Sequence, residues 1–167
     1  MELSLMIEGQ EGITWSHWVE LASACERHSI PALLRSDHYL NLHDHEERGS
    51  LEAWGTLTAL AAVTSRVRLG TLVTPVTVRH PSVLAKLVAT ADQISGGRVE
   101  LGLGAGWHER GHDAYGFAFP PLRVRMDMLE EELQVLLGTW ADGSFSYDGV
   151  HYRVRELDAQ PKPAQRP

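Results

Sequence analysis

The chain has 167 residues, of which 43% are hydrophobic and 22% are charged. This composition is typical of a globular domain with one core, and it excludes a disordered chain. The formal net charge of -7 offers no basic surface to nucleic acid or to an anionic membrane. No apolar run reaches the roughly 20 residues of a spanning helix, and the first residues carry no signal-peptide pattern. We therefore expect a cytoplasmic protein that binds a small molecule.

Apolar periodicity predicts strands in alternation with helices. Strands are predicted at residues 3–7, 30–35, 67–73 and 99–103, and helices at residues 15–25, 51–61, 81–94 and 122–140. Thr14 and Ser50 are predicted N-caps, Pro81 opens the third helix, and two glycines at 96–97 end it. The single cysteine, Cys25, falls on the apolar side of the first helix, so we expect a buried thiol.

Four tryptophans are expected in the core rather than around a cofactor, namely Trp15, Trp18, Trp54 and Trp140. The last helix carries an apolar stripe of the kind that faces a core, formed by Leu122, Met126, Leu129, Leu133, Leu136 and Trp140. The three glutamates at 130–132 lie mostly off this stripe. Asp148 and Gly149, between two short β-type segments, predict a two-residue β-hairpin turn, and a proline-rich segment follows.

Four strand–helix units in sequence predict a parallel sheet with right-handed crossovers. A closed barrel of eight such units takes about 250 residues, so this chain accounts for half of one. We expect one α/β domain over residues 1–167, a half-barrel of the TIM type plus a β-hairpin, truncated before the fifth barrel strand. Such a half would expose two sheet edges and an apolar face, which favours association with another copy or with a missing half.

The unusual loops follow predicted strands, at the ends where ligands bind in α/β folds. Asp37 and His38 suit a general base or acid with an orienting carboxylate. Because His43, Asp44 and His45 follow in the same loop, a metal site there is an alternative, and a solvated surface loop is another.

The segment at 99–119 combines a strand with glycines, aromatic residues and titratable residues. Gly102, Gly104 and Gly106 admit a close backbone or a flat ligand, and close packing alone explains them equally well. A dinucleotide loop is disfavoured because Trp107 interrupts the G-x-G-x-x-G pattern.

Residues 108–112 match the H-E-x-x-H pattern of zinc hydrolases, with the glutamates at 130–132 as candidates for a third ligand. That pattern works only on a helix, and the glycines at 111 and 116 predict a loop. A solvated loop is therefore favoured and no metal is assigned.

Five segments together carry a family resemblance: SDHY at 36–39, LGTLVTPVTVRHPSVLAK at 69–86, ADQISGGRVELGLGAGW at 91–107, FPPLRVRMDMLEEELQVLLGTW at 119–140 and PKPAQRP at 161–167. Taken jointly, they resemble the luciferase-like monooxygenase superfamily, particularly its oxidoreductases that use the deazaflavin coenzyme F420. The resemblance implies an eight-stranded TIM-type barrel whose flat cofactor ring rests at the carboxyl ends of the strands.

The resemblance also implies roles for individual residues. His38 would be the general acid or base, with Asp37 as its partner and as a cofactor contact. A bulge with a non-proline cis peptide, near Thr71 and Leu72, would back the ring. The implied cofactor contacts are Asp37, Thr71, Leu72, Val73, Thr74, Gly104, Ala105, Gly106 and Trp107, and the implied substrate contacts are Tyr39 and Glu109. Some sugar-oxidising relatives have a catalytic glutamate where this chain has Trp107, so their substrate does not transfer.

The expected activity is hydride transfer between coenzyme F420 and a small organic substrate. FMN with molecular oxygen is the close alternative on the same fold. A different class of function is a non-catalytic half-barrel that folds as a homodimer or with a missing partner half.

Overall fold

The computed structural model describes residues 3–43 and 47–165. Its elements are β1 (Ser4–Ile7), α1 (Trp15–Arg27), β2 (Ala32–Arg35), α2 (Ala53–Val63), β3 (Arg68–Pro75), α3 (Pro81–Ser95), β4 (Val99–Gly104), α4 (Glu109–Tyr115), α5 (Leu122–Trp140), β5 (Phe145–Asp148) and β6 (Arg153–Leu157). Strands and helices alternate through β4, which confirms the predicted α/β class.

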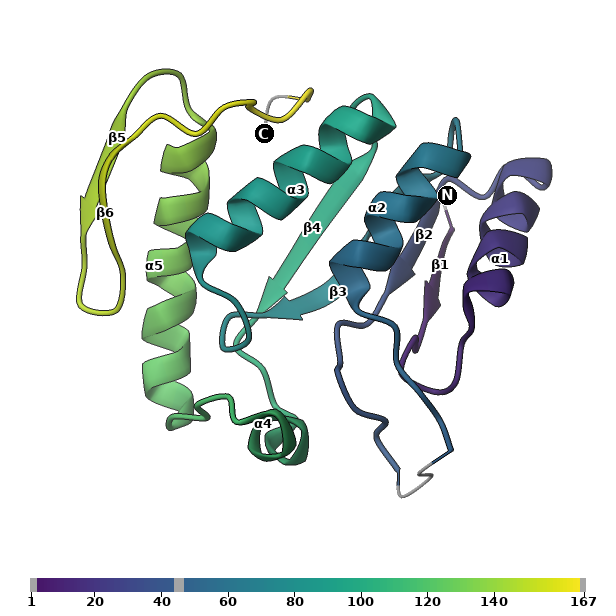
Figure 1. The fold of residues 1–167 in the computed structure, drawn as a ribbon, viewed down its shortest axis with the longest axis horizontal. Coiled ribbons are helices and arrows are strands. Elements are labelled where there is room, and N and C mark those ends of the chain that lie inside the picture. Colours follow the sequence, from purple (N-terminus) through teal and green to yellow (C-terminus); the bar gives the residue numbers. More distant parts are fainter. Residues whose placement is uncertain (1–2, 44–46, 166–167) are drawn as a thin grey trace.

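The first four strands form a parallel sheet in the order β1-β2-β3-β4. The helices α1, α2 and α3 lie on one face of this sheet, and α5 lies beyond α3 (Figure 1). Because the strands are parallel, their carboxyl ends share one edge. In Figure 1 this edge lies at the bottom, where α4 and the segment after β2 are found.

The core lies between the sheet and its helices. The register aligns Leu5, Leu33, Leu69 and Val99 in one row across the four strands, and this row packs on the helices. Trp18 and Trp54 are fully buried in this core, and Trp140 packs against it. Cys25 is buried as predicted, and its burial raises the pKa of the thiol. The predicted core position of Trp15 is wrong, because this first residue of α1 is 41% exposed.

Helix ends follow side-chain capping chemistry. Thr14 is the N-cap of α1 as predicted, and its hydroxyl accepts from the His17 backbone N at 3.4 Å. The N-cap of α2 is Glu52 rather than Ser50, since the Glu52 carboxylate accepts from the Gly55 N at 2.5 Å. The Ser50 hydroxyl instead donates to the His38 carbonyl at 2.7 Å. It therefore ties the loop after β2 to the segment that leads into α2.

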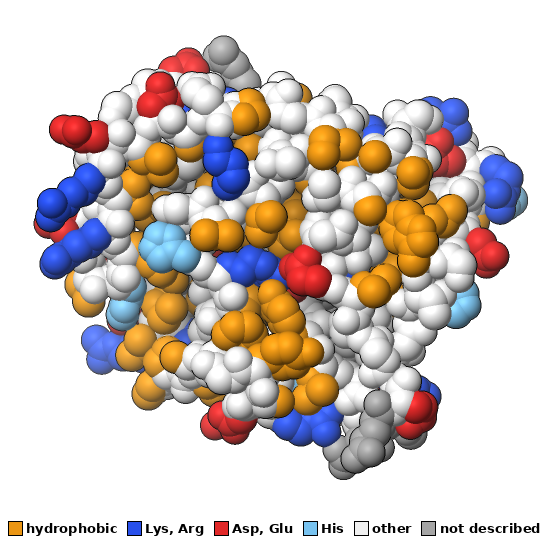
Figure 2. All heavy atoms as spheres, viewed as in Figure 1, with side chains coloured by type: hydrophobic (Ala, Val, Ile, Leu, Met, Phe, Trp, Pro, Cys, Tyr) orange, Lys and Arg blue, Asp and Glu red, His pale blue; other side chains and the backbone are white. Residues whose placement is uncertain are grey.

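Only the C-terminal part of the apolar stripe predicted on α5 faces the core, where Leu136 is buried and Trp140 packs against it. Leu122, Met126 and Leu133 are exposed, while the polar Glu132 is fully buried. The helix packs on α3 and on the hairpin, so the periodicity identified the stripe but not which part of it neighbouring elements cover. On the helix-covered side of the molecule, apolar side chains form separate patches, one of them over α1 and α2 (Figure 2).

The strands β5 and β6 form the predicted antiparallel hairpin, but its turn is longer than predicted. The strands end at Asp148 and begin again at Arg153, so four residues connect them instead of two. The carboxylate of Glu131 on α5 accepts from three backbone N–H groups of this turn, at 2.8, 3.0 and 3.1 Å. The turn is thereby held by the helix.

The opposite face of the sheet carries no helix within the described residues, and β1 and β4 form its two edges. This face is partly polar, since Arg68 and Glu100 pair across it at 2.5 Å. After β6 the chain returns to the start of β4, where Asp92 accepts from the backbone N atoms of Ala164 and Gln165 at 2.7 and 3.0 Å. Nowhere in residues 3–43 and 47–165 does a helix have the length and apolarity needed to cross a membrane.

Candidate cofactor and active site

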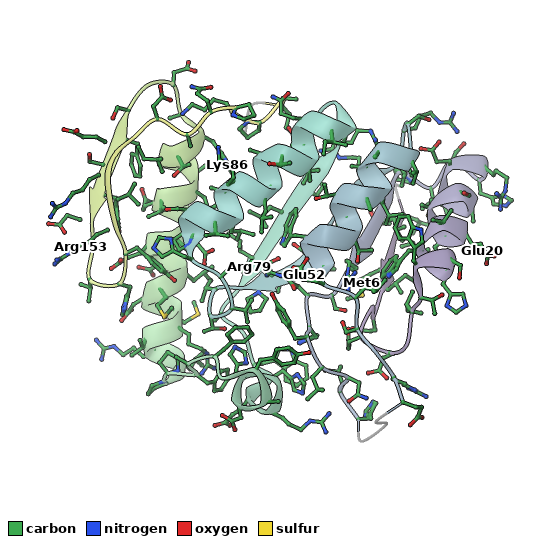
Figure 3. All side chains as sticks on the ribbon, in the orientation of Figure 1. Met6, Glu20, Glu52, Arg79, Lys86 and Arg153 are labelled. Carbon is green, nitrogen blue, oxygen red and sulfur yellow. The ribbon has the colours of Figure 1, made fainter. Side chains whose placement is uncertain are left out.

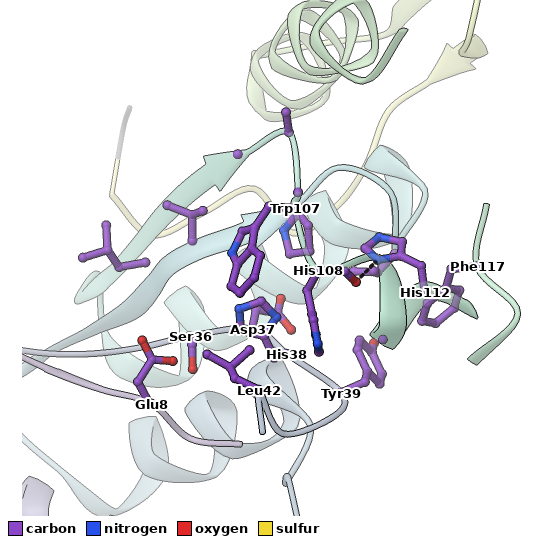
Figure 4. A pocket seen from close by; sticks show the side chains of 18 of the residues that line it. Glu8, Ser36, Asp37, His38, Tyr39, Leu42, Trp107, His108, His112 and Phe117 are labelled. Carbon is purple, nitrogen blue, oxygen red and sulfur yellow. Dashed lines mark hydrogen bonds between the residues drawn. The ribbon is translucent and has the colours of Figure 1, made fainter. Parts of the chain in front are cut away.

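A pocket of about 350 Å³ lies at the carboxyl ends of the strands (Figure 4). Side chains from the ends of β1, β2, β3 and β4 and from α4 line it. The predicted site residues that line it are Asp37, His38, Tyr39, Leu72, Val73, Gly104, Ala105, Gly106 and Trp107. The structure therefore brings together most of the residues singled out in the sequence. Thr71, Thr74 and Glu109 are not part of the lining.

The wall formed by β3 contains the predicted bulge. The pairing with β4 shifts register between Thr71 and Thr74, and the Leu72–Val73 peptide bond is cis. The cis bond thus lies one residue later than the predicted position near Thr71 and Leu72. Leu72 and Val73 are 50% and 38% exposed and both face the pocket, whereas Thr71 and Thr74 are buried. The bulge therefore presents two adjacent apolar side chains to the pocket.

The glycines on β4 are required by strand packing. A Cβ at Gly102 would lie 2.4 Å from the Thr71 carbonyl oxygen, and a Cβ at Gly104 would lie 2.7 Å from Val73 Cγ2. Both positions admit only glycine without movement of β3. The close-packing explanation therefore accounts for Gly102 and Gly104, and the second of these also lines the pocket.

Asp37 has a different partner from the predicted one. Its carboxylate is almost fully buried and accepts from Arg79 Nη1 at 2.6 Å and Nη2 at 3.0 Å. The Thr74 hydroxyl donates a third bond to it at 2.8 Å. No hydrogen bond joins Asp37 to His38 within residues 3–43 and 47–165, so the structure shows no direct contact by which Asp37 would orient the His38 imidazole. A bidentate arginine pair is the stronger interaction for a buried carboxylate.

Arg79, which the sequence reasoning missed, is the centre of a buried charge network. Its guanidinium also pairs with Glu52 and lies over the Tyr39 ring at 5.5 Å from the ring centre. Figure 3 shows Arg79 and Glu52 next to each other where α2 and α3 begin. Burial alone would lower the pKa of Arg79, but the Asp37 and Glu52 carboxylates raise it above its ordinary value. The only signal in the sequence was a lone arginine two residues before the helix-opening proline.

His38 is half-buried beside two aromatic rings. Its ring centre lies 5.5 Å from that of Trp107 and 5.3 Å from that of His108, both edge to face. Burial lowers the pKa of His38, and the Glu8 and Asp37 carboxylates oppose this effect only in part. The imidazole is therefore neutral at pH 7, as a group that accepts a proton must be. Trp107 is 64% exposed at the mouth of the pocket.

The segment around the H-E-x-x-H match is helical, not a loop. Residues Glu109–Tyr115 form α4. Glycine is needed at position 111, because a Cβ there would lie 2.9 Å from His108 Nδ1. Gly116, at φ +71°, ends the helix. In the part of the chain that the structure describes, no three histidine, cysteine or acidic side chains are grouped to hold a metal. Glu109 is exposed on α4 and lies outside the pocket lining, so its predicted substrate contact is not supported by the geometry.

The loop after β2 reaches across to α4. Arg110 donates to the Asn41 carbonyl at 2.7 Å and to the His43 carbonyl at 3.2 Å. Asp44 and His45, which belonged to the alternative metal cluster, lie outside the described residues. The contacts of Arg110 hold one rim of the pocket in place.

A second polar network, also missed in the sequence, joins β1 to β2. Glu8 lines the pocket and accepts from Gln10 Nε2 at 2.6 Å. The Ser36 hydroxyl bonds to the Gln10 side chain and accepts from the Gly9 N at 3.1 Å. Glu8 directly follows β1 at the edge of the sheet where the pocket lies.

Comparison with known proteins agrees with this architecture. The chain matches the family described as luciferase-like monooxygenase over residues 2–167. The chain belongs to this family. It is 32% identical over 151 residues to the F420-dependent glucose-6-phosphate dehydrogenase of Nakamurella multipartita (strain ATCC 700099 / DSM 44233 / CIP 104796 / JCM 9543 / NBRC 105858 / Y-104), which covers 89% of this chain and 44% of that protein.

Two solved structures show the same fold. An F420-dependent secondary alcohol dehydrogenase in complex with an F420-acetone adduct has a TM-score of 0.86 at 24% identity, over 99% of this chain and 51% of that one. The oxygenating constituent of 3,6-diketocamphane monooxygenase from Pseudomonas putida, in complex with FMN, has a TM-score of 0.76 at 20% identity, over 98% and 46%. This chain therefore spans about half the length of the proteins it matches, which confirms the predicted half of a TIM-type barrel.

Proposed function

We propose that this chain forms the cofactor-binding half of a luciferase-like oxidoreductase that transfers a hydride between coenzyme F420 and a small organic substrate. The observation that carries this proposal is the wall formed by the β3 bulge and the end of β4. Leu72, Val73 and the segment 104–106 present a low, apolar surface at the carboxyl ends of the strands. A flat ring system fits such a surface, because no bulky polar side chain interrupts it.

In this proposal, different pocket residues support the cofactor ring and transfer the proton. Leu72 and Val73 would support one side of the ring, and Gly104 and Ala105 would lie along it. Trp107, exposed at the mouth, would cover the bound molecules and exclude water. The deazaflavin, when bound, supplies a carbon that accepts or returns a hydride. His38, kept neutral by burial, takes the proton from a substrate hydroxyl or returns it.

Asp37 takes a positioning role in this proposal. Its carboxylate is occupied by Arg79 and Thr74, so it holds the backbone at the end of β2 against the end of β3. The next residue, His38, is thereby kept at the pocket. Tyr39 lies over the Arg79 guanidinium and offers its ring to the substrate side.

A luciferase-like monooxygenase that uses FMN and molecular oxygen is the second candidate. It is favoured by the FMN complex among the structures of the same fold. The same apolar wall would support an isoalloxazine ring, so the geometry of this half does not separate the two cofactors.

A non-catalytic half-barrel is the candidate from another class. The open sheet, with β1 and β4 as free edges, favours association with a second copy or with a partner half. In this case the pocket would be incomplete without the second half.

The deciding experiment is a titration of the purified 167-residue chain with coenzyme F420 and, separately, with FMN. Absorbance and fluorescence report binding, and mass and metal content are measured on the same sample. Micromolar binding of F420 supports the first proposal, and binding of FMN alone supports the second. A stable dimer that binds neither cofactor supports the third.

Two variants test whether binding uses the proposed wall. Ala105→Phe places a ring in the pocket and should abolish cofactor binding, because Ala105 belongs to its lining. Val150→Phe adds the same bulk on the hairpin turn, at a residue that is 89% exposed, and should bind as the unchanged chain does. Equal binding by both variants would place the cofactor elsewhere.

A further inference from the structure

The segment 75–79 leads from the end of β3 to α3 and borders the pocket. Pro75 and Val78 belong to the pocket lining. Between them, the Val76 backbone N donates to the Gly104 carbonyl at 3.0 Å, at the end of β4. The position of this segment therefore sets part of the pocket wall.

Two side chains of the same segment hold residues from other elements at the pocket. The Thr77 hydroxyl lies 2.5 Å from Nε2 of His112 on α4. The Arg79 guanidinium binds both carboxylate oxygens of Asp37, which follows β2. A displacement of this segment would therefore disturb the α4 side and the β2 side of the pocket together.

Tyr152, which directly precedes β6, connects the hairpin to this segment. Its hydroxyl lies 3.5 Å from the Val76 carbonyl oxygen, and its buried ring meets the ring of His80 edge to face at 5.5 Å. His80 is the N-cap of α3 and directly follows the segment. One hairpin side chain thus contacts the segment and the start of the next helix.

Glu132 is buried where the hairpin packs on α5 (Figure 1). Val135, one turn further along the helix, forms a small core with Tyr152 and Val154 of the hairpin. Burial raises the pKa of Tyr152, and the charge of Glu132 adds to this effect, so the two groups lie near each other. Among the described residues, neither carboxylate oxygen of Glu132 has a hydrogen-bond partner. An ionised carboxylate in this place would have neither water nor a donor to stabilise it.

The surrounding charges do not offset the burial of Glu132. Arg79 acts on it from the segment before α3, but this guanidinium is already paired with Asp37 and Glu52. Burial therefore prevails and raises the pKa of Glu132 to about 8. The titratable groups around this contact are Glu131 and Glu132 on α5, Arg79 and His80 before α3, and His151 and Tyr152 on the hairpin.

We propose that Tyr152 is a positioning residue of the pocket, and that protonation of the Glu132 carboxyl group keeps it in place. With the carboxyl protonated, the hairpin packs on α5, and Tyr152 supports Val76 and His80. When the proton leaves to solvent, the buried charge favours an open hairpin, in which water reaches Glu132 and Tyr152 withdraws from the segment. The hairpin contact stands by itself, whereas its consequence for ligand binding rests on the proposed function.

The first test measures hydrogen exchange of backbone amides by NMR from pH 5 to pH 8, relative to the exchange rate of an unstructured peptide. The closed hairpin holds the Glu132 proton up to about pH 8, and the open hairpin releases it near the ordinary value of 4.5. Protection of the β5 and β6 amides should therefore fall by up to about tenfold per pH unit. The β2 amides, in the core of the sheet, should change less. No fall in the hairpin, or an equal fall in β2, overturns the inference.

Two variants assign the pH dependence to one carboxyl group. Glu132→Gln cannot ionise, so the fall in hairpin protection should disappear. Glu130→Gln removes an exposed glutamate from the same helix and, as the matched control, should keep the fall. His80 and His151 remain in both variants, so the difference between them isolates the Glu132 carboxyl group. The same fall in Glu132→Gln contradicts the proposal.

The Val76 amide reports the effect at the pocket, because it donates to the Gly104 carbonyl. Tyr152→Leu should lower its protection about fivefold, the effect of one aromatic pair. Tyr152→Phe loses only the hydroxyl and should have a smaller effect. Tyr147→Leu removes a tyrosine that packs on the same small core, and it should leave the Val76 amide unchanged. Unchanged Val76 exchange in both Tyr152 variants overturns the positioning role.

The two leucine variants are also titrated with F420 at pH 7, so that the two proposals fail separately. Weaker F420 binding by Tyr152→Leu than by Tyr147→Leu supports the positioning role, and equal binding contradicts it. Absence of F420 binding by the unchanged chain removes the proposed cofactor. The Val76 exchange then decides the role of Tyr152.

Discussion

Asp37 and Glu132 are both buried carboxylates, one at the pocket and one between α5 and its neighbours, yet their hydrogen bonding differs. Asp37 accepts three hydrogen bonds, two from Arg79 and one from Thr74. Neither carboxylate oxygen of Glu132 has a hydrogen-bond partner among the described residues. Burial raises the pKa of Glu132 to about 8, so near neutral pH a large share of this side chain is uncharged. At the pocket, the buried carboxylate of Asp37 is paired with Arg79. At the α5 interface, the buried carboxyl group of Glu132 is instead accommodated in its protonated, uncharged form.

The strongest way to break this comparison is to remove Arg79. Arg79→Leu leaves the Asp37 carboxylate buried without its counter-charge, and we expect it to lower the free energy of unfolding by about 3–5 kcal/mol. Urea denaturation at pH 7 measures this value. Arg79→Lys keeps the charge but not the bidentate geometry, and its loss should be smaller. A loss below about 1 kcal/mol in Arg79→Leu would contradict the assigned role.

The second prediction concerns the pH dependence caused by Glu132. Its pKa is raised in the folded state, so the folded chain retains a proton that the unfolded chain releases. Stability therefore falls as the pH rises from the ordinary carboxyl range near 4.5 toward about 8. The slope from this group is at most about 1.4 kcal/mol per pH unit. In Glu132→Gln this part of the slope should disappear, as measured by thermal unfolding across that pH range.

The adjacent Glu131 should show a pH dependence of stability opposite in sign to that of Glu132. Burial tends to raise the pKa of Glu131, but the backbone N–H groups of the hairpin turn outweigh it and lower the pKa. Its contribution to stability is present at neutral pH and is lost as the pH falls through its folded pKa. Glu131→Gln should cost about 1–2 kcal/mol at pH 7 and less in acid, because neutral acceptors bind more weakly. An equal cost at both pH values would exclude the charged hydrogen bonds as the cause.

The parts of the fold that were predictable from sequence are those set by local chemistry. Apolar periodicity and helix capping predicted the four strands and the long helices, because both depend on residues close together in the sequence, as at the Thr14 N-cap of α1. The α4 helix was missed because Gly111 was interpreted as a helix breaker, while the structure uses it to make room for the His108 ring. The N-terminal part of the α5 stripe is exposed, because apolar periodicity identifies one face of a helix but not the element that covers it.

The candidate site shows the same limit. Asp37, His38 and the glycines of β4 stand out in the sequence because their types and strand-end positions are unusual. Arg79 does not, since its partner lies 42 residues away and only the fold brings the two together. The family resemblance predicted a bulge on β3 with a cis bond near Thr71 and Leu72, and in the structure the cis bond joins Leu72 and Val73. Long-range pairing and exact backbone geometry were the features beyond the reach of sequence patterns.

The tether between Asp92 and the segment at 164–165 bears on how this protein can be handled. It fixes the last described residues beside the first residue of β4, and Gln165 Nε2 also donates to the Val99 carbonyl at 2.6 Å. The pocket lies at the other end of the same strands. A fluorescent label or a surface anchor attached at this end of the sheet would therefore leave the ligand entrance free, which makes it the natural place to immobilise the chain for binding measurements.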